Sequence, residues 1–544
     1  MSVSGPSPPR RSGGERPAAL TRTARRRQRS WFLVGGAAVG LLALFLRCYA
    51  LGSQSFWIDE ISVTSFVRSG HVLSDLRSRG GPFEPPLHYL TVLAALHLPF
   101  GFETAARIPS AIFGTLEVLA LVLLTREATG RRVTALVAGL LLAVAPFAVR
   151  YSQENRYYVM YSTLALVSWW LLLRALRRRD RAAWVWYGVV AAAMQLTHPF
   201  APLVLVLEAL VVGWILWRER GTPGTRVLRR GYGLAIVVGV VLILPWYVYG
   251  AITWIPNLIN GKSYALNPSG QFAVPFDTDL FKRGGEWLLG NSATLTLLVA
   301  LAVIAVLAAP VLARGRTRVV AAAAVAYVLI FFVVLVPLAR ALGTYFAYRR
   351  VESLVAPMVL AMAITIVAGF DRLRTAHVSR RVALATGAVA VAVLTALSLA
   401  ASISYYGTDK TNFRAFAREV RDAPHGRRII VGASTHRSSG LIRDYLHWKG
   451  VDRDLSFIVP GRSQSSGSLP ADGVLWLTGA PPQRTDMTTR ALNDLSKMQV
   501  IAGDKSGLLI VLPWFASTSH PRSVEELAAQ RAAIARLPPF LPAP

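Results

Sequence analysis

The chain has 544 residues, of which 53% are hydrophobic and only 16% are charged. Soluble proteins contain roughly 45–50% apolar and about 25% charged residues, so a water-soluble fold is excluded for most of the chain. The net charge is +30, from 59 Lys and Arg against 29 Asp and Glu. In a soluble protein this excess indicates a polyanionic partner, whereas in a membrane protein it can report which loops face the cytoplasm.

Apolar runs of about 17 to 23 residues recur along the chain, and each is long enough to cross a hydrocarbon core of about 30 Å. They predict eleven membrane spans, at residues 31–50, 107–125, 133–149, 157–173, 183–198, 200–217, 232–250, 293–313, 319–339, 354–370 and 382–402. A twelfth run, residues 86–100, is shorter and contains His88 and His97. Whether this run crosses the membrane decides the predicted side of every later loop.

The arginines between the runs settle that question. Without a span at 86–100, and with residues 1–30 inside, short cytoplasmic segments contain 28 of the 59 basic residues, whereas the longer opposite loops contain 11. A span at 86–100 would move the later arginine clusters outside, against the positive-inside rule. We therefore interpret 86–100 as a helix at the outer interface. The predicted outer loops are then 51–106, 150–156, 251–292 and 340–350, and the C-terminus lies outside.

The two ends of the chain differ from its apolar centre. Residues 1–30, rich in Arg, Pro, Ser and Gly, predict a disordered basic cytoplasmic tail. Residues 405–515 predict an extracytoplasmic α/β domain, and residues 516–544 a Pro-rich tail. The expected helices of the α/β domain are 412–422, 438–448 and 485–497, and its expected strands are 428–431, 455–459, 474–478 and 508–513. The fold class is therefore mainly α: a polytopic membrane domain over 31–402 with a small C-terminal α/β domain.

The absence of several motifs narrows the function. The single cysteine, Cys48, cannot form an internal disulfide, and the chain has no P-loop, GxGxxG, HExxH or GxSxG pattern. Because topology accounts for much of the positive charge, we expect no nucleic-acid partner. Only six of the 59 basic residues are Lys, which is typical of GC-rich, actinobacteria-like genomes.

The first outer loop begins with Trp57, followed by Asp59 and Glu60. Two carboxylates beside aromatics at a membrane interface are costly to desolvate unless they are paired or used, so they are candidates for function. The alternative is an interfacial tryptophan followed by a solvated acid pair.

The second outer loop, residues 150–156, is a short segment between two spans and belongs to a polar cluster that extends over 150–158. Glu154 is its candidate functional acid, unless Arg150 or Arg156 simply neutralises it in a hairpin cap. His198, beside Pro199, is either a substrate contact or a structural hydrogen bonder. Further along, Arg349 and Arg350 lie on the predicted outer side and could bind a lipid phosphate or merely anchor to headgroups.

Five motifs in this order on one face resemble those of the C-type integral membrane glycosyltransferases. They are Trp57-Ile58-Asp59-Glu60, the PPLHYL stretch at 85–90, the YSQENRYY run at 151–158, Thr197-His198-Pro199, and Tyr348-Arg349-Arg350-Val351-Glu352. The resemblance is narrowest to bacterial relatives of protein O-mannosyltransferases and aminoarabinose transferases, and it covers residues 31–402. It implies an enzyme of the bacterial inner membrane that moves a hexose or pentose such as mannose, with inversion, from a polyprenyl-phosphate donor. The acceptor would be a cell-wall glycan, a lipid or a protein.

The resemblance also implies roles for residues. Asp59 is the candidate base, with Glu60 beside it, and Glu154 is the acidic group that the second outer loop supplies. At this loop Glu154-Asn155-Arg156 departs from the Arg-hydrophobic-Asp pattern of the relatives. Cations would stabilise the departing phosphate, and the candidates are Arg349, Arg350, Lys262 and Lys282. The expected substrate contacts are Trp57, His88, Tyr151, Gln153, Asn155, Arg156, Tyr157, His198, Tyr345 and Tyr348. The resemblance implies no definite cofactor. A divalent metal would fit where Asp59, Glu154 and His198 converge, because carboxylate oxygens suit hard cations, and the metal is left unassigned.

Two other functions are compatible with the composition. A transporter or flippase of a lipid-linked sugar would need polar residues along a path through the spans, where Glu117 and Glu208 are the main charges. A membrane anchor presenting the C-terminal domain as a binding module would leave the polar outer loops unexplained.

Overall fold

The computed structural model describes residues 22–80, 84–260, 293–330, 333, 352–376 and 378–406. In the C-terminal part it describes residues 413–422, 429–432, 436–452, 455–458 and 474–477. The predicted disordered tail up to residue 21, the predicted elements at 485–497 and 508–513, and the Pro-rich tail 516–544 lie outside these residues.

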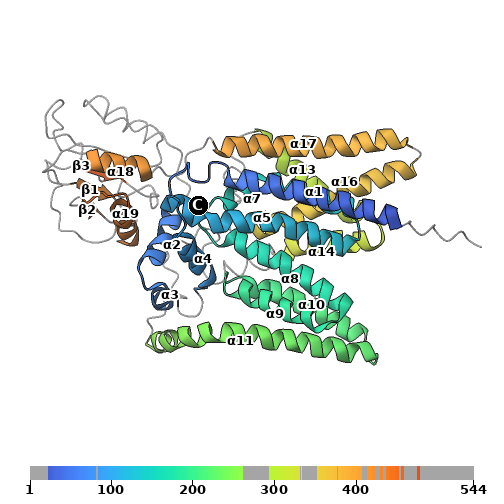
Figure 1. The fold of residues 1–544 in the computed structure, drawn as a ribbon, viewed down its shortest axis with the longest axis horizontal. Coiled ribbons are helices and arrows are strands. Elements are labelled where there is room, and N and C mark those ends of the chain that lie inside the picture. The colour runs from blue at the N-terminus through green and yellow to red at the C-terminus, as the bar shows by residue number, and fades with distance from the viewer. Residues whose placement is uncertain are drawn as a thin grey trace, which may run out of the picture.

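The centre of the molecule is a bundle of long apolar helices that run roughly side by side (Figure 1). Within the described part of the chain, seven helices contain a segment long and apolar enough to cross a membrane. They are α1 (Arg22–Cys48), α5 (Phe102–Thr129), α8 (Tyr158–Arg178), α10 (Ala201–Arg218), α11 (Pro223–Ile259), α16 (Glu352–Thr375) and α17 (Arg380–Tyr406). The predicted polytopic helical membrane fold is confirmed.

The remaining predicted spans also fall on helices, as far as the structure describes them; of the span 319–339, residues 319–330 lie in a helix and most of the rest lies outside the described residues. The helices are α9 (Arg181–Gln195), α13 (Ala293–Leu312), α14 (Gly315–Ile330) and the pair α6 (Arg132–Val144) and α7 (Pro146–Ser152). We expected one straight span at 133–149, but α6 and α7 are bent by 61°. Pro146 lacks the N–H that would continue the hydrogen-bond ladder, so it begins a new helix instead. The bend turns α7 and the polar loop that follows it towards the first outer loop.

The first outer loop is built from three short helices, α2 (Ile58–Arg68), α3 (Val72–Gly80) and α4 (Leu87–Ala95). The nine residues of α4 extend only about 14 Å, too short for a membrane, as expected for the 86–100 run. By contrast, α11 has 37 residues and is longer than the predicted span 232–250. The first residues of the expected outer loop 251–292 therefore continue this helix, and α11 projects beyond the bundle beside α3 (Figure 1).

The C-terminal part lies beyond α2 at the same end of the bundle (Figure 1). It comprises α18 (Phe413–Asp422), β1 (Ile429–Gly432), α19 (His436–Trp448), β2 (Leu455–Ile458) and β3 (Val474–Leu477). The strands form a parallel sheet of order β2-β1-β3, with Ile429 opposite both Leu455 and Val474. Each lies within two residues of the element expected there. A parallel pair needs a crossover, which α19 provides between β1 and β2.

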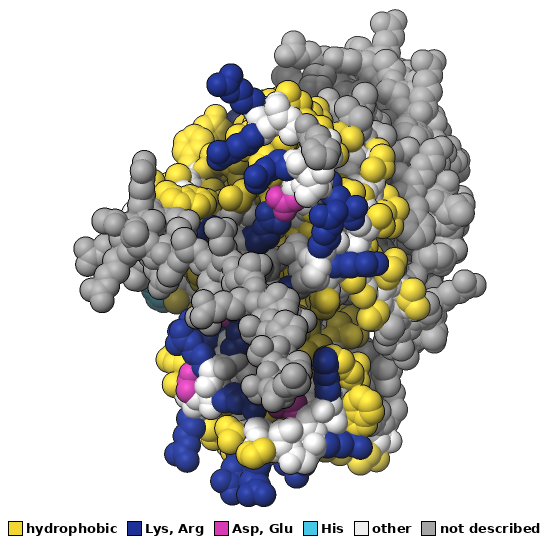
Figure 2. Space-filling view, turned by 90° about the vertical axis from the view of Figure 1, so that its right-hand side faces the viewer, with side chains coloured by type: hydrophobic (Ala, Val, Ile, Leu, Met, Phe, Trp, Pro, Cys, Tyr) yellow, Lys and Arg dark blue, Asp and Glu magenta, His cyan; other side chains and the backbone are white. Residues whose placement is uncertain are grey.

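The basic residues gather at the opposite end of the bundle. Figure 2 shows that end, with many Lys and Arg side chains and few acids on its surface. They come from the cytoplasmic segments predicted above, including the last turns of α5, α8, α10 and α16. The predicted separation of charge along the chain is therefore also a separation in space, and the polar outer loops occupy the end with fewer arginines.

Candidate active site

Glu60 is fully buried, and donors surround both oxygens of its carboxylate. Arg107, from the first turns of α5, grips it with Nε 2.7 Å from Oε1 and Nη2 2.7 Å from Oε2. The backbone N–H of Asn155 donates to Oε1 at 2.8 Å, and that of Trp57 to Oε2 at 3.3 Å. Bidentate arginine–carboxylate contacts are among the strongest and most directional polar contacts. Glu60 thus fixes the first outer loop to the second.

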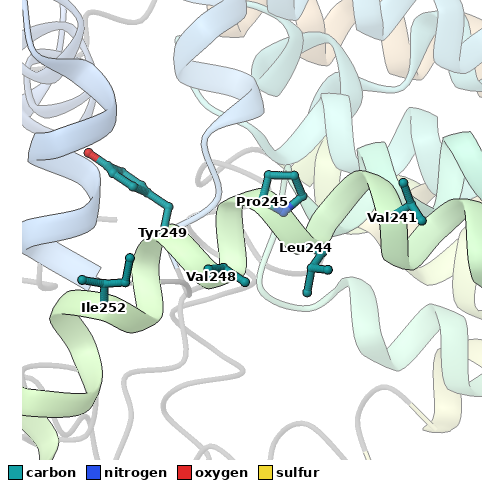
Figure 3. A pocket seen from close by; sticks show the side chains of 6 residues that line it. All are labelled: Val241, Leu244, Pro245, Val248, Tyr249 and Ile252. Atoms are coloured by element: carbon teal, nitrogen blue, oxygen red, sulfur yellow. The ribbon is translucent and has the colours of Figure 1, made fainter.

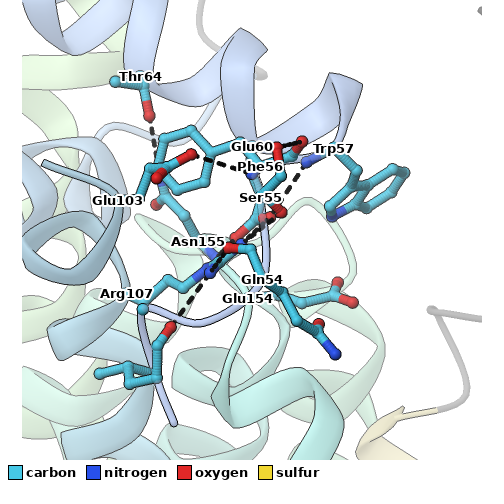
Figure 4. A network of polar contacts seen from close by, with 12 residues as sticks. Gln54, Ser55, Phe56, Trp57, Glu60, Thr64, Glu103, Arg107, Glu154 and Asn155 are labelled. Atoms are coloured by element: carbon cyan, nitrogen blue, oxygen red, sulfur yellow. Dashed lines mark hydrogen bonds and ion pairs between the residues drawn. The ribbon is translucent and has the colours of Figure 1, made fainter. Parts of the chain in front are cut away.

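Arg107 also holds the backbone that leads into α2. Its Nη1 donates to the carbonyls of Leu51 and Gln54, at 3.1 and 2.7 Å, and its Nη2 to that of Ser55 at 3.0 Å. Figure 4 shows the guanidinium between Glu60 and this loop. Reading of the sequence missed Arg107. The sequence feature that could have identified it is its position as a lone arginine at the start of the apolar run 107–125, where an ionisable residue indicates a function or a specific partner.

Asp59 differs from its neighbour, because its side chain is 25% exposed whereas that of Glu60 is 0% exposed. The carboxylate lies 3.9 Å from Nη2 of Arg156, whose Nη1 donates to the Asp59 carbonyl at 3.4 Å. Arg156 in turn lies over the rings of Tyr157 and Tyr158. Burial alone would lower the pKa of Arg156, but Tyr158, Tyr157 and Asp59 raise it well above its ordinary value. Arg156 therefore stays positively charged beside Asp59.

The other polar side chains of the second loop are engaged within the protein. Asn155 Nδ2 donates to Thr64 Oγ1 of α2 at 3.0 Å. Gln153 Nε2 lies within 3.2 Å of the carbonyls of Leu46, Arg47 and Tyr49, and so caps the end of α1. Figure 4 shows Glu154 and Asn155 close to the first loop.

Glu154 is almost fully buried, and its Oε1 lies 3.5 Å from Nε of Arg150. This contact is the one expected if Arg150 neutralises Glu154, the alternative left open for this loop. Tyr151 is buried against Phe147, and Trp57 is buried at the start of α2.

Two histidines flank Tyr157. His88 on α4 is 1% exposed, and its ring centroid is 6.1 Å from that of Tyr157. His198 is 3% exposed, stacks on Tyr161 at 4.5 Å and lies 4.9 Å from Tyr157. Burial, together with the positive charge of Arg156, lowers the pKa of His88 to about 3, so this imidazole is neutral at physiological pH.

The structure thus brings together Trp57, Asp59, Glu60, His88, residues 151–157 and His198. The other predicted site residues, namely Lys262, Lys282, Tyr345, Tyr348, Arg349 and Arg350, lie outside the described residues. Within the described part of the chain, no three His, Cys, Asp or Glu side chains are placed to hold a metal ion. The divalent site considered at Asp59, Glu154 and His198 is therefore not formed as a ligand cluster there.

An apolar groove of about 430 Å³ runs along α11 (Figure 3). It is lined by Val241, Leu244, Pro245, Val248, Tyr249 and Ile252. None of the polar residues described above lines it. Tyr249 connects it to the first outer loop, because Arg77 of α3 lies over its ring.

Comparison with known proteins supports the predicted relationship. Residues 84–249 match the family model of dolichyl-phosphate-mannose-protein mannosyltransferase. The undecaprenyl phosphate-alpha-4-amino-4-deoxy-L-arabinose arabinosyl transferase of Pseudomonas savastanoi pv. phaseolicola is 28% identical over 218 residues. That alignment covers 38% of this chain and 40% of the relative, so the chain spans less than half the length of this relative.

Two solved structures align with this chain at low similarity. The oligosaccharyltransferase of Archaeoglobus fulgidus aligns with a TM-score of 0.47 at 16% identity, over 79% of this chain and 64% of that one. ArnT from Cupriavidus metallidurans aligns with a TM-score of 0.36 at 17% identity, over 81% and 87% of the two chains. The family match spans three of the five motifs, those at residues 85–90, 151–158 and 197–199. This family match and the similarity to the arabinosyl transferase confirm the predicted resemblance of this chain to the C-type integral membrane glycosyltransferases.

Proposed function

We propose that the protein transfers a sugar, with inversion, from a polyprenyl-phosphate donor to an acceptor outside the cytoplasm, and that Asp59 is the general base. The observation that carries the proposal is the contrast between two adjacent acids. The carboxylate of Glu60 is buried and fully bonded, whereas that of Asp59 is partly exposed on the same turn of helix. Only Asp59 of this pair is accessible to an incoming hydroxyl.

In this reaction the acceptor oxygen attacks the anomeric carbon while its proton passes to the Asp59 carboxylate. A carbon–oxygen bond to the acceptor forms, and the bond between the anomeric carbon and the phosphate oxygen breaks. The lipid phosphate leaves with the bonding electron pair and needs no general acid, because the departing phosphate anion is a weak base. A base opposite the leaving group gives inversion, as in inverting glycosidases.

The surrounding groups have distinct parts in this proposal. Arg156 orients Asp59 through contacts with both the backbone carbonyl and the carboxylate of Asp59. The neutral His88 and the stacked His198 shape the wall of the site around Tyr157. Arg349, Arg350, Lys262 and Lys282 remain the candidates for the phosphate. The names of the family and of the arabinosyl transferase support a polyprenyl-phosphate donor carrying a hexose or a pentose.

We place the enzyme in the bacterial inner membrane, with the arginine-rich end of the bundle in the cytoplasm and the site outside. The flippase alternative receives less support from the described spans. Glu117 accepts a hydrogen bond from Ser162, and Glu208 accepts hydrogen bonds from Ser168 and Tyr187. Both acids therefore have local partners within the bundle.

The test incubates the purified protein with polyprenyl-phosphate mannose, arabinose and glucose, and measures donor consumption and sugar transfer. Asp59→Asn should lower the transfer rate by about 10²- to 10⁴-fold, the usual contribution of a general base. Asp75→Asn, in the same outer loop but on α3, is the matched control and should transfer normally. A correctly inserted Asp59→Asn protein that works at the wild-type rate would refute the assignment. Movement of an intact donor across a vesicle membrane would favour the flippase instead.

A further inference from the structure

The backbone just before Asp59 is held from two sides by two arginines. Arg107 of the membrane bundle donates to the carbonyls of Leu51, Gln54 and Ser55. Arg414 of α18 donates to those of Gly52, Ser53 and Gln54, at 2.5, 2.8 and 3.2 Å. Between them the two guanidinium groups bind all five carbonyls from residue 51 to residue 55. Of these five residues Ser53 is exposed, Gly52 is half-buried and the other three are buried. Most of the carbonyls therefore depend on the two arginines for hydrogen bonds that water would supply at an exposed position.

Glu103, in the first turn of α5, holds Arg414 in this position. Its Oε2 lies 2.8 Å from Nε and 2.6 Å from Nη2 of Arg414, and 3.0 Å from Nζ of Lys449. Its Oε1 accepts hydrogen bonds from the Tyr445 hydroxyl and from the backbone N–H of Phe56. The buried carboxylate of Glu103 in the membrane domain therefore binds three side chains of the C-terminal part and one backbone N–H of the loop that contains Asp59.

The same interface has an apolar core. Phe56 and Ile61 of the first outer loop pack in one cluster with Phe413, Ile442 and Tyr445 of α18 and α19. Polar contacts surround this core: Ser65 donates to Asp444 at 2.7 Å, and the hydroxyls of Ser55 and Tyr445 lie 3.3 Å apart. A C-terminal module carried on a flexible anchor would not share a core with the loop that contains the candidate base.

We infer that Arg414 is a positioning residue for Asp59, and that the C-terminal part holds the Asp59 loop in its catalytic geometry through Glu103 and Arg414. The inference rests on the proposed function for its catalytic consequence. We call the contacts of Arg414 with Glu103 and with the carbonyls of residues 52–54 the clamp. Loss of the clamp frees residues 51–55 on the side of the C-terminal part, while Arg107 and Glu60 still hold the loop on the side of the membrane bundle. The expected defect is thus a misplaced base in a folded enzyme, and displacement of a catalytic group by about 1 Å can cost about 10²-fold in rate.

The first test is independent of activity. Amide hydrogen exchange of peptides covering residues 51–60 should be faster in Arg414→Ala than in the wild-type full-length protein. Arg418→Ala, one turn further along α18 at an exposed position, is the matched control and should exchange like the wild type. Unchanged exchange of this segment in Arg414→Ala would overturn the clamp whether or not the protein proves to be a transferase.

The second test separates positioning from general stability. With the donor that the wild type consumes, Arg414→Ala should lower kcat by about 10- to 100-fold with little change in the KM for that donor. Arg414→Lys should recover part of the rate, because its ammonium can still pair with Glu103 but cannot reach three carbonyls. Normal kcat in Arg414→Ala, or a loss explained wholly by a lower folded fraction in size-exclusion chromatography, would contradict the inference. Failure of the wild type to consume any donor would instead reject the proposed function, leaving the exchange test to decide on the clamp.

Discussion

At the scale of single residues, the most informative feature is that neighbouring acids occupy different environments. Asp59 and Glu60 sit side by side at the start of α2, yet successive residues of a helix point about 100° apart. Glu60 consequently faces Arg107 in the interior, and Asp59 faces the partly open side near Arg156. Sequence patterns identified the pair as a functional candidate but could not separate the two roles, because Arg107 lies 47 residues away.

Replacement of Arg107 tests the structural role of its pair with Glu60. In Arg107→Met the Glu60 carboxylate would stay buried without its main partner, which typically costs about 3–5 kcal/mol. Thermal unfolding of the detergent-solubilised protein should show a markedly lower midpoint. Arg131→Met is the control, since the Arg131–Asp371 pair is more than one-third exposed on both sides and should contribute less than about 1 kcal/mol. Equal effects of the two changes would show that the Glu60 site is not a buried anchor.

His88 predicts a specific dependence of stability on pH. Its pKa is about 3 in the folded protein against an ordinary value of 6.5, so between these values only the unfolded chain binds the proton. The free energy of unfolding should therefore fall as pH falls through this window. His88→Gln removes this protonation of the unfolded chain, so the midpoint of thermal unfolding should depend less steeply on pH between 7 and 5. Parallel profiles for the two proteins would contradict the buried, neutral state of His88.

At the scale of elements, the hydrophobic pattern predicted the helices and most of the C-terminal strands because local periodicity determines them. It did not predict the break between α6 and α7, although Pro146 signalled it, because an apolar run looks continuous across a bend. It also did not predict that α11 continues past residue 250. The contacts between loops were beyond prediction, since Arg414 and Glu103 are 311 residues apart and no local pattern relates them.

The close approach of α5 to α7 and α1 depends on one glycine. A Cβ at Gly114 would lie 2.0 Å from Ser152 Oγ and 2.8 Å from Arg47 Nε. Gly114→Ala should therefore destabilise the protein by about 1–3 kcal/mol through overpacking, despite the better helix propensity of Ala. Gly36→Ala in α1 is the matched control, because nothing lies within 4 Å of its added Cβ. Thermal midpoints that fall in Gly114→Ala but not in Gly36→Ala would support this packing, and a neutral Gly114→Ala would contradict it.

At the scale of the whole molecule, the two ends of the bundle are chemically distinct. One end has the arginine clusters of the short loops (Figure 2), and the other has α2, α3, α4 and the C-terminal part (Figure 1). The positive charge that first suggested a polyanionic partner is thus concentrated away from the candidate site. Counting Lys and Arg in each loop predicted this segregation, because the positive-inside rule depends on the number of basic residues in a loop and not on the exact positions of their side chains.

Cysteine labelling can determine which end faces the cytoplasm, because Cys48 is the only cysteine in the chain. In a Cys48→Ser background, His71→Cys places a thiol at an exposed position between α2 and α3. Ala182→Cys places one at an exposed position in the first turn of α9, beside the arginine-rich turn after α8. A membrane-impermeant maleimide should label His71→Cys in intact cells but Ala182→Cys only after permeabilisation. The reverse pattern would place Asp59 in the cytoplasm. It would then exclude an acceptor on the outer face, because the donor sugar and the base must lie on the same side of the membrane.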